Sequence, residues 1–325
     1  MNAPPTVLLT RFNLPTGGVE GLIRAREGWL RERVDLFERY TVPSVQAQTA
    51  GAVHWIVYLD PQSPAWLMER MEGWRQQSLL VPVQRSAPSL GDLAVDLWKV
   101  TGTGHGPVIT ANLDNDDALA VDFVERLQGA PAKGPRNAIY LTRGLVRSGD
   151  KLFLRTDKLN AFCAVREPLD DPVTCWADWH NRLPLSMPVV HRGGSPAWLQ
   201  VVHGANVSNR ARGRLTNAQA YKALFPGLLD DVKEPSRHAR ATDVLIRVPG
   251  RQIRDGLRSG SRRLVVQVLG KDGFDRMKYL AARGASAEGS RELARRQPSA
   301  RAVVPQPGRS RGSDNQRDAS EQSET

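Results

Sequence analysis

Apolar segments of strand length alternate with segments of helical periodicity over the first 113 residues, and this alternation restricts the chain to a few folds. The expected strands are TVLLTRF (6–12), VHWIVYL (53–59), a third near 79–84, and VITANL (108–113). Apolar residues at helical spacing predict helices at 27–40, around 64–77 and at 90–100. This order of elements predicts an α/β fold with a mostly parallel sheet flanked by helices.

The rest of the chain has weaker signals. The first helix is expected to end before Pro43, and another helix is expected at 120–128, directly after an acidic segment. Two paired strands are predicted at 137–146 and 151–156, with a turn at Ser-Gly-Asp. Residues 157–232 are interpreted as irregular, with one strand at 197–204 and a helical piece at 215–225; a further helical piece is expected at 238–258.

Composition excludes several classes of protein. The 325 residues are 40% hydrophobic, which is enough for a sizeable core. No segment approaches the roughly 20 apolar residues of a membrane-spanning helix, and the start of the chain lacks the features of a signal peptide. The two cysteines, Cys163 and Cys175, match no zinc-binding or CxxC spacing. We therefore expect reduced thiols in a cytoplasmic protein.

Positive charge is concentrated in one part of the sequence. The net charge is +11, and residues 233–283 hold 13 Lys and Arg against 5 Asp and Glu. Few apolar residues follow from about Gly284. The chain is accordingly divided into an α/β domain (1–232), a basic, partly helical extension (233–283) and a disordered tail (284–325). The extension is either a solvated Arg-rich face or a surface for an anionic partner.

The segment ITANLDNDDALAVDF (109–123) places Asp114, Asp116 and Asp117 directly after a predicted buried strand. Carboxylates so close together repel each other, and burying them is costly without a counter-charge. One interpretation is a helix N-terminus, which a single Asp would cap. The other is a divalent cation, since Mg²⁺ or Mn²⁺ is commonly held by one or two carboxylates and substrate phosphates at this edge of α/β sheets.

The acidic segment resembles the DxD motif of the GT-A glycosyltransferases, which use nucleotide-activated sugars. Five segments in order resemble a bacterial family described as putative rhamnosyltransferases: LLTRFN, PSVQAQT (43–49), WIVYLD, LDNDD and WLQVVHGANVSNRARG. The likeness covers about residues 6 to 214. It implies a GT-A-like, Rossmann-like domain over 1–232. It also implies transfer of a sugar, with rhamnose a candidate, from a nucleotide-diphosphate donor to a hydroxyl of a glycan or lipid-linked acceptor.

The resemblance also implies roles for individual residues. Donor-binding residues would be Thr10, Arg11, Asp60, Asp114, Asn115 and Arg210. Metal ligands for Mn²⁺ or Mg²⁺ would be Asp116 above all, with Asp114, Asp117 and His203. Asp117 is either a second ligand or a helix cap, Asp60 is alternatively a turn carboxylate before Pro61, and His203 is alternatively a structural histidine.

A transfer that inverts the anomeric carbon needs a base for the acceptor hydroxyl. Glu167, in AVREP, and Asp178, in CWADWH between two tryptophans, are the two leading candidates, and Asp170 and Asp171 are further ones. The Glu-Asp pair found in many such enzymes is absent, and so is a Gln-x-x-Arg-Trp motif. The identity of the base therefore stays open, and a processive polysaccharide synthase is not expected.

Two other function classes compete with this interpretation. A nucleotidyltransferase also pairs carboxylates with metal on an α/β sheet, but LPTGGVEG lacks the basic residues between glycines that such enzymes carry. The other is non-enzymatic binding of an anion or of nucleic acid through the basic region; nucleic acid would need aromatic or basic readout motifs, and no known one appears, so no nucleic-acid partner is expected. Within the glycosyltransferase interpretation, RQIRDGLRSGSRRLVVQVLG (251–270) would contact an anionic membrane leaflet peripherally.

Overall fold

The computed structural model describes residues 3–15, 28–51, 53–203 and 213–243. The chain divides into a unit of residues 1–278 and a second unit of residues 279–325. The second unit lies outside the described residues, as do the predicted tail and most of the predicted basic extension. The described residues of the first unit form two β-sheets with associated helices.

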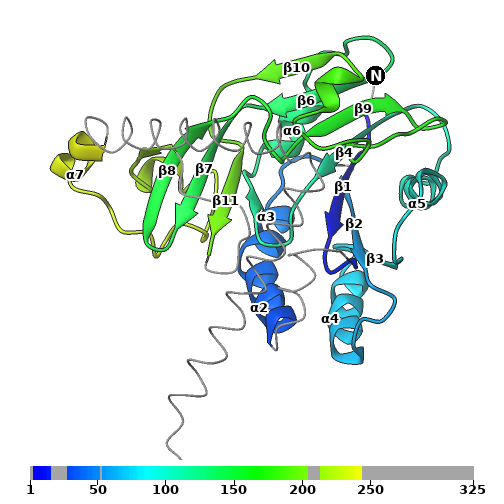
Figure 1. Cartoon of the computed structure of the whole chain (residues 1–325), viewed down its shortest axis with the longest axis horizontal. Coiled ribbons are helices and arrows are strands. Elements are labelled where there is room, and N and C mark those ends of the chain that lie inside the picture. The colour runs from blue at the N-terminus through cyan, green and yellow to red at the C-terminus, as the bar shows by residue number, and fades with distance from the viewer. Residues whose placement is uncertain (1–2, 16–27, 52, 204–212, 244–325) are drawn as a thin grey trace, which may run out of the picture. The chain divides into compact units, whose positions relative to one another are not determined.

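A seven-stranded sheet forms the centre of this unit, in the strand order β10-β6-β9-β4-β1-β2-β3. Parallel pairs join β1 to β2 and β4, β2 to β3, and β10 to β6, whereas β9 is antiparallel to both β4 and β6. The strands are β1 (Thr6–Arg11), β2 (Val53–Leu59), β3 (Val81–Gln84), β4 (Pro107–Asn112), β6 (Asn137–Leu141), β9 (Ala164–Pro168) and β10 (Val189–Arg192). The predicted α/β class, with a mostly parallel sheet and flanking helices, is confirmed (Figure 1).

A smaller second sheet has the order β12-β8-β7-β11-β5. Its strands are β5 (Ala118–Leu119), β7 (Arg143–Ser148), β8 (Lys151–Thr156), β11 (Trp198–Val202) and β12 (Arg214–Leu215). The antiparallel β7–β8 pair confirms the hairpin predicted around Ser-Gly-Asp. The segment expected to be one strand at 137–146 is instead two, because the chain leaves the first sheet as β6 and enters the second as β7 after Thr142.

Helices account for most of the remaining elements. They are α2 (Trp29–Leu36), α3 (Val42–Gln46), α4 (Ala65–Gln76), α5 (Leu90–Thr101), α6 (Phe123–Gln128) and α7 (Arg237–Thr242). Two 3₁₀ turns lie at Leu183–Leu185 and Gln219–Tyr221, and the second replaces the helical piece expected at 215–225. Among the described residues, none of the helices is long and apolar enough to cross a membrane.

Pro43 does not end the first helix, contrary to the sequence-based expectation. A π-helical turn, Phe37–Thr41, follows α2, and α3 then continues with Pro43 in its first turn. The backbone stays helical through Thr41 and Val42, and the N–H of Val42 donates to the carbonyl of Phe37, five residues earlier. The π turn changes the backbone hydrogen bonding just before Pro43 from the i−4 to the i−5 carbonyl, and the helix continues although proline has no N–H to donate.

The residues directly after the acidic segment form a short strand, and the helix predicted at 120–128 follows it as α6 (Phe123–Gln128). Ala118 and Leu119 make up β5, which pairs with Leu199 and Trp198 of β11. Helix α6 begins only at Phe123, after Asp122. The interpretation of the acidic residues as a helix cap is therefore wrong, because β5 and the residues after it separate Asp117 from that helix.

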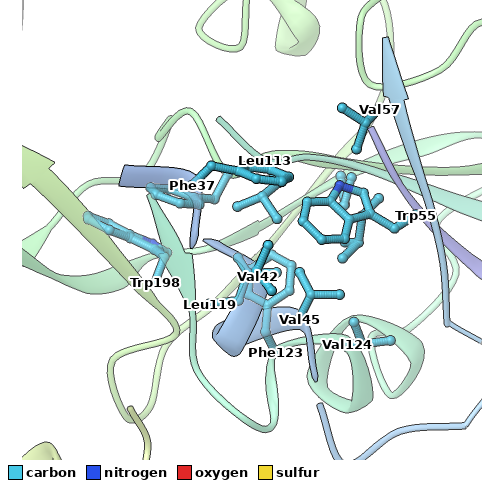
Figure 2. Packing of buried hydrophobic residues seen from close by; sticks show 14 of the residues in the cluster. Phe37, Val42, Val45, Trp55, Val57, Leu113, Leu119, Phe123, Val124 and Trp198 are labelled. Atoms are coloured by element: carbon cyan, nitrogen blue, oxygen red, sulfur yellow. The ribbon is translucent and has the colours of Figure 1, made fainter. Parts of the chain in front are cut away.

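The largest hydrophobic cluster joins both sheets to the π turn and α3. It contains Trp55 of β2, Phe37 and Val42, Leu119 of β5 and Trp198 of β11, all of them buried. Figure 2 shows Trp198 and Trp55 on opposite sides of Val42 and Leu113. Each buried side chain of this size stabilises the fold by about 1.5–3 kcal/mol. The core thus fixes the acidic segment, which connects β4 of one sheet to β5 of the other.

Candidate functional site

The acidic segment 114–117 lies at the carboxyl end of β4, where the chain crosses from the first sheet to the second. Because β1 and β4 are parallel neighbours, the ends of both strands meet at this edge. Pairing of β5 with β11 also brings the end of β11, and with it His203, to the same place. The topology therefore gathers residues from three distant segments around the acidic loop, as ligand sites in α/β folds require.

Asp116 is the most strongly bound carboxylate of the loop. Its Oδ2 lies 2.6 Å from Nη1 of Arg33 and 2.9 Å from Nε2 of His203. The Asp116 residue is only 6% exposed. Burial opposes ionisation of this carboxyl, but the hydrogen bond from His203 and the Arg33 guanidinium outweigh it and hold the pKa of Asp116 below its usual value. An anionic Asp116 beside an imidazole is a suitable pair of ligands for a divalent cation.

Asp117 has a structural contact at the same edge. Its Oδ1 accepts a hydrogen bond of 2.8 Å from the backbone N–H of Val201, and its carbonyl accepts one from the Thr41 hydroxyl. Burial and repulsion from Asp116 and Asp114 raise the pKa of Asp117 well above its usual value. This side chain thus attaches β11 to the acidic loop and helps to place His203, two residues after Val201.

Asp114 points to the other side of the loop and lines a pocket of about 520 Å³. The carboxylate is accessible from the pocket, yet protein surrounds it closely, and this desolvation together with Asp116 raises its pKa. The pocket is lined by Arg11, Asn112, Asp114, Ala161, Cys163, Cys175, Trp176, Asp178, Trp179, His180 and Gln200. Both cysteines are free thiols, as predicted, and both are buried.

Asn112, the last residue of β4, organises one wall of this pocket. Its Nδ2 donates to Oδ1 of Asp114 at 3.2 Å, and its Oδ1 accepts from the indole Nε1 of Trp176 at 2.7 Å. The guanidinium of Arg11 lies 4.2 Å from the ring centre of Trp176, a cation–π contact. Asn112 therefore orients Asp114 and Trp176 together. This residue is not among those predicted from the sequence, although its place at the end of β4 was a signal.

Of the two candidate bases, the structure brings only Asp178 to the pocket. Asp178 lines it with Asp114, its side chain is 34% exposed, and its Oδ2 lies 3.1 Å from Nε of Arg182. Trp179 beside it is 71% exposed. An accessible carboxylate next to an exposed indole is a suitable surface for a sugar hydroxyl and its ring.

Glu167 lies at the opposite end of the sheet. It pairs with Val108 near the start of β4, whereas the acidic loop follows the end of that strand. Its carboxylate is fully buried and accepts hydrogen bonds from the backbone N–H groups of Val173 and Thr174 and from Arg136. Burial raises the pKa of Glu167. This side chain holds the segment after β9, and it is not among the residues that line the pocket.

The other predicted donor residues lie at the same edge as the acidic loop, with partners of their own. The Thr10 hydroxyl is buried and donates to the carbonyl of Leu113. Asn115 donates to the carbonyl of Phe12 at 2.6 Å. Asp60 follows β2 and accepts from the Gln62 N–H, which is the turn contact considered as its alternative. Arg210 lies outside the described residues, so its predicted role stays a prediction.

The residues around Asp116 would fit a divalent cation whose remaining ligands come from a substrate. Asp116 and His203 supply a carboxylate and an imidazole at one point, and Mg²⁺ or Mn²⁺ commonly completes its shell with substrate phosphates and water. In the described ranges, no group of three or more His, Cys, Asp or Glu residues is placed to hold a metal ion.

Comparison with known proteins gives one family match. The family described as "Putative rhamnosyl transferase" matches residues 5–215, more than half of the chain. The match spans β1, the acidic loop, both predicted bases and His203. No curated protein sequence matches the chain significantly.

Similar solved structures are remote. TarS of S. aureus, residues 1–349 in complex with UDP-GlcNAc, has a TM-score of 0.41 at 9% identity, covering 86% of this chain and 79% of that one. Another TarS structure of S. aureus has a TM-score of 0.38 at 10% identity, with 61% of this chain and only 37% of that chain covered. The inositol-1-phosphate CTP transferase of T. maritima has a TM-score of 0.36 at 9% identity, with 71% and 99% covered.

Proposed function

We propose, from the premise that this chain belongs to the putative rhamnosyl transferase family, that it transfers a sugar from a nucleoside diphosphate to a hydroxyl acceptor with inversion and with a divalent metal ion. Membership of the family makes the chain a glycosyltransferase; the metal, the stereochemistry and the sugar are the proposal. Its main support is the contact between Asp116 and His203 on one side of the acidic loop, together with the pocket on the other side that Asp114 and Asp178 line.

In this proposal the donor diphosphate lies at the acidic loop. Asp116 and His203 would hold Mn²⁺ or Mg²⁺, which when bound neutralises negative charge on the departing nucleoside diphosphate. Asp114 and Arg11 face the adjacent pocket, where the sugar and ribose would bind. Arg11 is kept in place by its contact with Trp176.

Asp178 would act as the general base. It takes the proton of the acceptor hydroxyl while the hydroxyl oxygen forms a bond to the anomeric carbon. The bond between that carbon and the diphosphate oxygen breaks, and the nucleoside diphosphate leaves with the electron pair. A single displacement of this kind inverts the anomeric carbon and needs no covalent enzyme intermediate.

The proposal is tested by calorimetric titration of the protein with UDP, GDP and dTDP, each with Mn²⁺ and with EDTA. We expect one nucleotide to bind, and to bind only with Mn²⁺, because the diphosphate completes the metal shell. Binding of dTDP would support a deoxysugar donor such as rhamnose. Binding of none of the three, with or without metal, would contradict the donor site.

We further propose that the acceptor is a glycan or a lipid-linked glycan at the cytoplasmic face of an anionic membrane. Support comes from the basic composition of residues 233–283, since each Lys or Arg near such a surface contributes about 1 kcal/mol. Replacing Arg251, Arg254, Arg258, Arg262 and Arg263 by Gln should strongly reduce flotation with phosphatidylserine vesicles. Equal flotation of this variant and the unmodified protein would contradict membrane contact through this region.

A further inference from the structure

Arg33 is a cation of the site that was not predicted from the sequence. It belongs to α2 and contacts the acidic loop across 83 positions of sequence, with its Nη1 2.6 Å from Oδ2 of Asp116. The same nitrogen lies 3.5 Å from Oδ1 of Asn115. The side chain of Arg33 is 12% exposed, so this ion pair is shielded from solvent. The indole of Trp29, one turn earlier in α2, lies 5.4 Å from the guanidinium.

The contact with Arg33 affects the oxygen that a metal ion would use. Oδ2 of Asp116 accepts from both Arg33 and His203. A cation held by both Asp116 and His203 would replace the hydrogen bond between these two side chains, and it would lie beside the Arg33 guanidinium, which occupies another lone-pair direction of the same oxygen. A guanidinium also repels a divalent cation at close range in a shielded site.

A diphosphate changes this balance. Arginine binds phosphate oxygens through two parallel hydrogen bonds, in the same way as it binds a carboxylate. When the metal arrives with a diphosphate, Arg33 can exchange its carboxylate partner for a phosphate group. The loss of the Asp116 pair is then offset by a new pair of similar strength. Free metal brings no such replacement.

We propose that Arg33 is the resident counter-ion of Asp116, which excludes free metal from the site and then binds the donor diphosphate when metal and nucleotide enter together. This inference rests on the proposed function and adds a donor-binding residue to it. It makes metal and nucleotide binding strongly cooperative, since each removes an obstacle to the other. The substrate class that satisfies both requirements is a nucleoside diphosphate or its sugar ester.

The test compares Arg33→Gln with the unmodified protein in two titrations. Mn²⁺ binding without nucleotide is measured by electron paramagnetic resonance of the free ion, and binding of the nucleoside diphosphate that the protein accepts is measured by calorimetry with saturating Mn²⁺. Arg33→Gln should bind Mn²⁺ alone about tenfold more tightly and the nucleotide about tenfold more weakly, within the usual range of coupling between sites. Arg31→Gln, an exposed arginine of the same helix that contacts Trp66, is the matched control and should change neither.

Arg33→Lys is a second variant that keeps the positive charge beside Asp116, so it tests the inference even where Arg33→Gln does not fold. It should still exclude free Mn²⁺, yet bind the nucleotide more weakly because lysine lacks the two-pronged geometry. If Arg33→Gln and Arg33→Lys both bind Mn²⁺ and nucleotide as the unmodified protein does, the inference is overturned while the proposed function stands. If the unmodified protein binds no nucleotide under any condition, the proposed function fails first.

Discussion

Asp116→Asn should lower the rate of glycosyl transfer by about 10²–10³-fold or more, because removal of a single charge-stabilising group from a preorganised site has effects of this size. Asparagine has nearly the same shape, but it carries no charge to hold a cation beside His203 or to pair with Arg33. Both the affinity for the donor and the rate at which the diphosphate departs would decrease. The measurement is the initial rate of nucleoside diphosphate release, with the nucleotide-sugar chosen by the calorimetric titration of UDP, GDP and dTDP.

Asp35→Asn is the matched control for Asp116→Asn. Asp35 is an exposed carboxylate of α2, two residues from Arg33, and its loss should leave the rate nearly unchanged. Because Arg33 would lose its buried partner, Asp116→Asn is also expected to destabilise the fold by about 3 kcal/mol. Rates are therefore compared per folded protein, with folding checked by circular dichroism. A folded Asp116→Asn protein with a nearly normal rate would contradict the role of this residue.

The parallel part of the sheet could be predicted because its signals are local. Each of the first four strands is an apolar run, and helices of clear periodicity separate them. The short strands could not be predicted in the same way. β5 has two residues, and it is a strand only because β11, some 80 positions later, pairs with it. β9 and β10 contain charged residues and are held by neighbours that are also distant in sequence.

Residues of the site could be predicted where acidic side chains directly follow a predicted strand. Asp114 and Asp116 follow an apolar strand, and the convergence of His203 with Asp116 was expected from family resemblance alone. Arg33 could not be identified, because an arginine on an amphipathic helix is ordinarily a solvated residue. Its role depends on how α2 packs against a loop 83 positions away. The contact of Asp117 with Val201 also depends on long-range pairing.

Strand register separates Glu167 from Asp178 as candidate bases, which the sequence alone could not do. Both carboxylates lie in the same poorly patterned region of the sequence. The antiparallel pairing of β9 with β4 places Glu167 near the amino end of β4. The following chain returns toward the carboxyl end of β4, where Cys175 hydrogen-bonds to Thr110 and Trp176 to Asn112. Asp178 lies in that following chain and reaches the pocket with Asp114. The spacing of the two carboxylates in the sequence does not show at which end of β4 each of them lies.

Asp178→Asn should therefore lower kcat by about 10²–10⁴-fold, the usual contribution of a general base, while the affinity for the nucleoside diphosphate stays nearly constant. Asparagine cannot accept the proton of the acceptor hydroxyl, so kcat falls. The nucleotide affinity should stay, because the diphosphate would bind at the acidic loop, whereas Asp178 lies in the adjacent pocket and pairs with Arg182. The measurement is kcat with saturating acceptor, together with nucleotide affinity by calorimetry. A fall in nucleotide affinity with no change in kcat would instead place Asp178 in the donor site.

Two further carboxylates make this result specific. Asp170→Asn removes an exposed carboxylate just after β9 and should leave kcat unchanged. Glu167→Gln removes a buried one whose hydrogen bonds hold the same segment, so it should lower stability to urea and leave kcat per folded protein nearly intact. If Glu167→Gln instead abolished turnover in a folded protein and Asp178→Asn did not, the base would have to reach the acceptor from the opposite end of the sheet. That outcome would require a rearrangement of β9, and it would overturn the assignment of the pocket as the place of transfer.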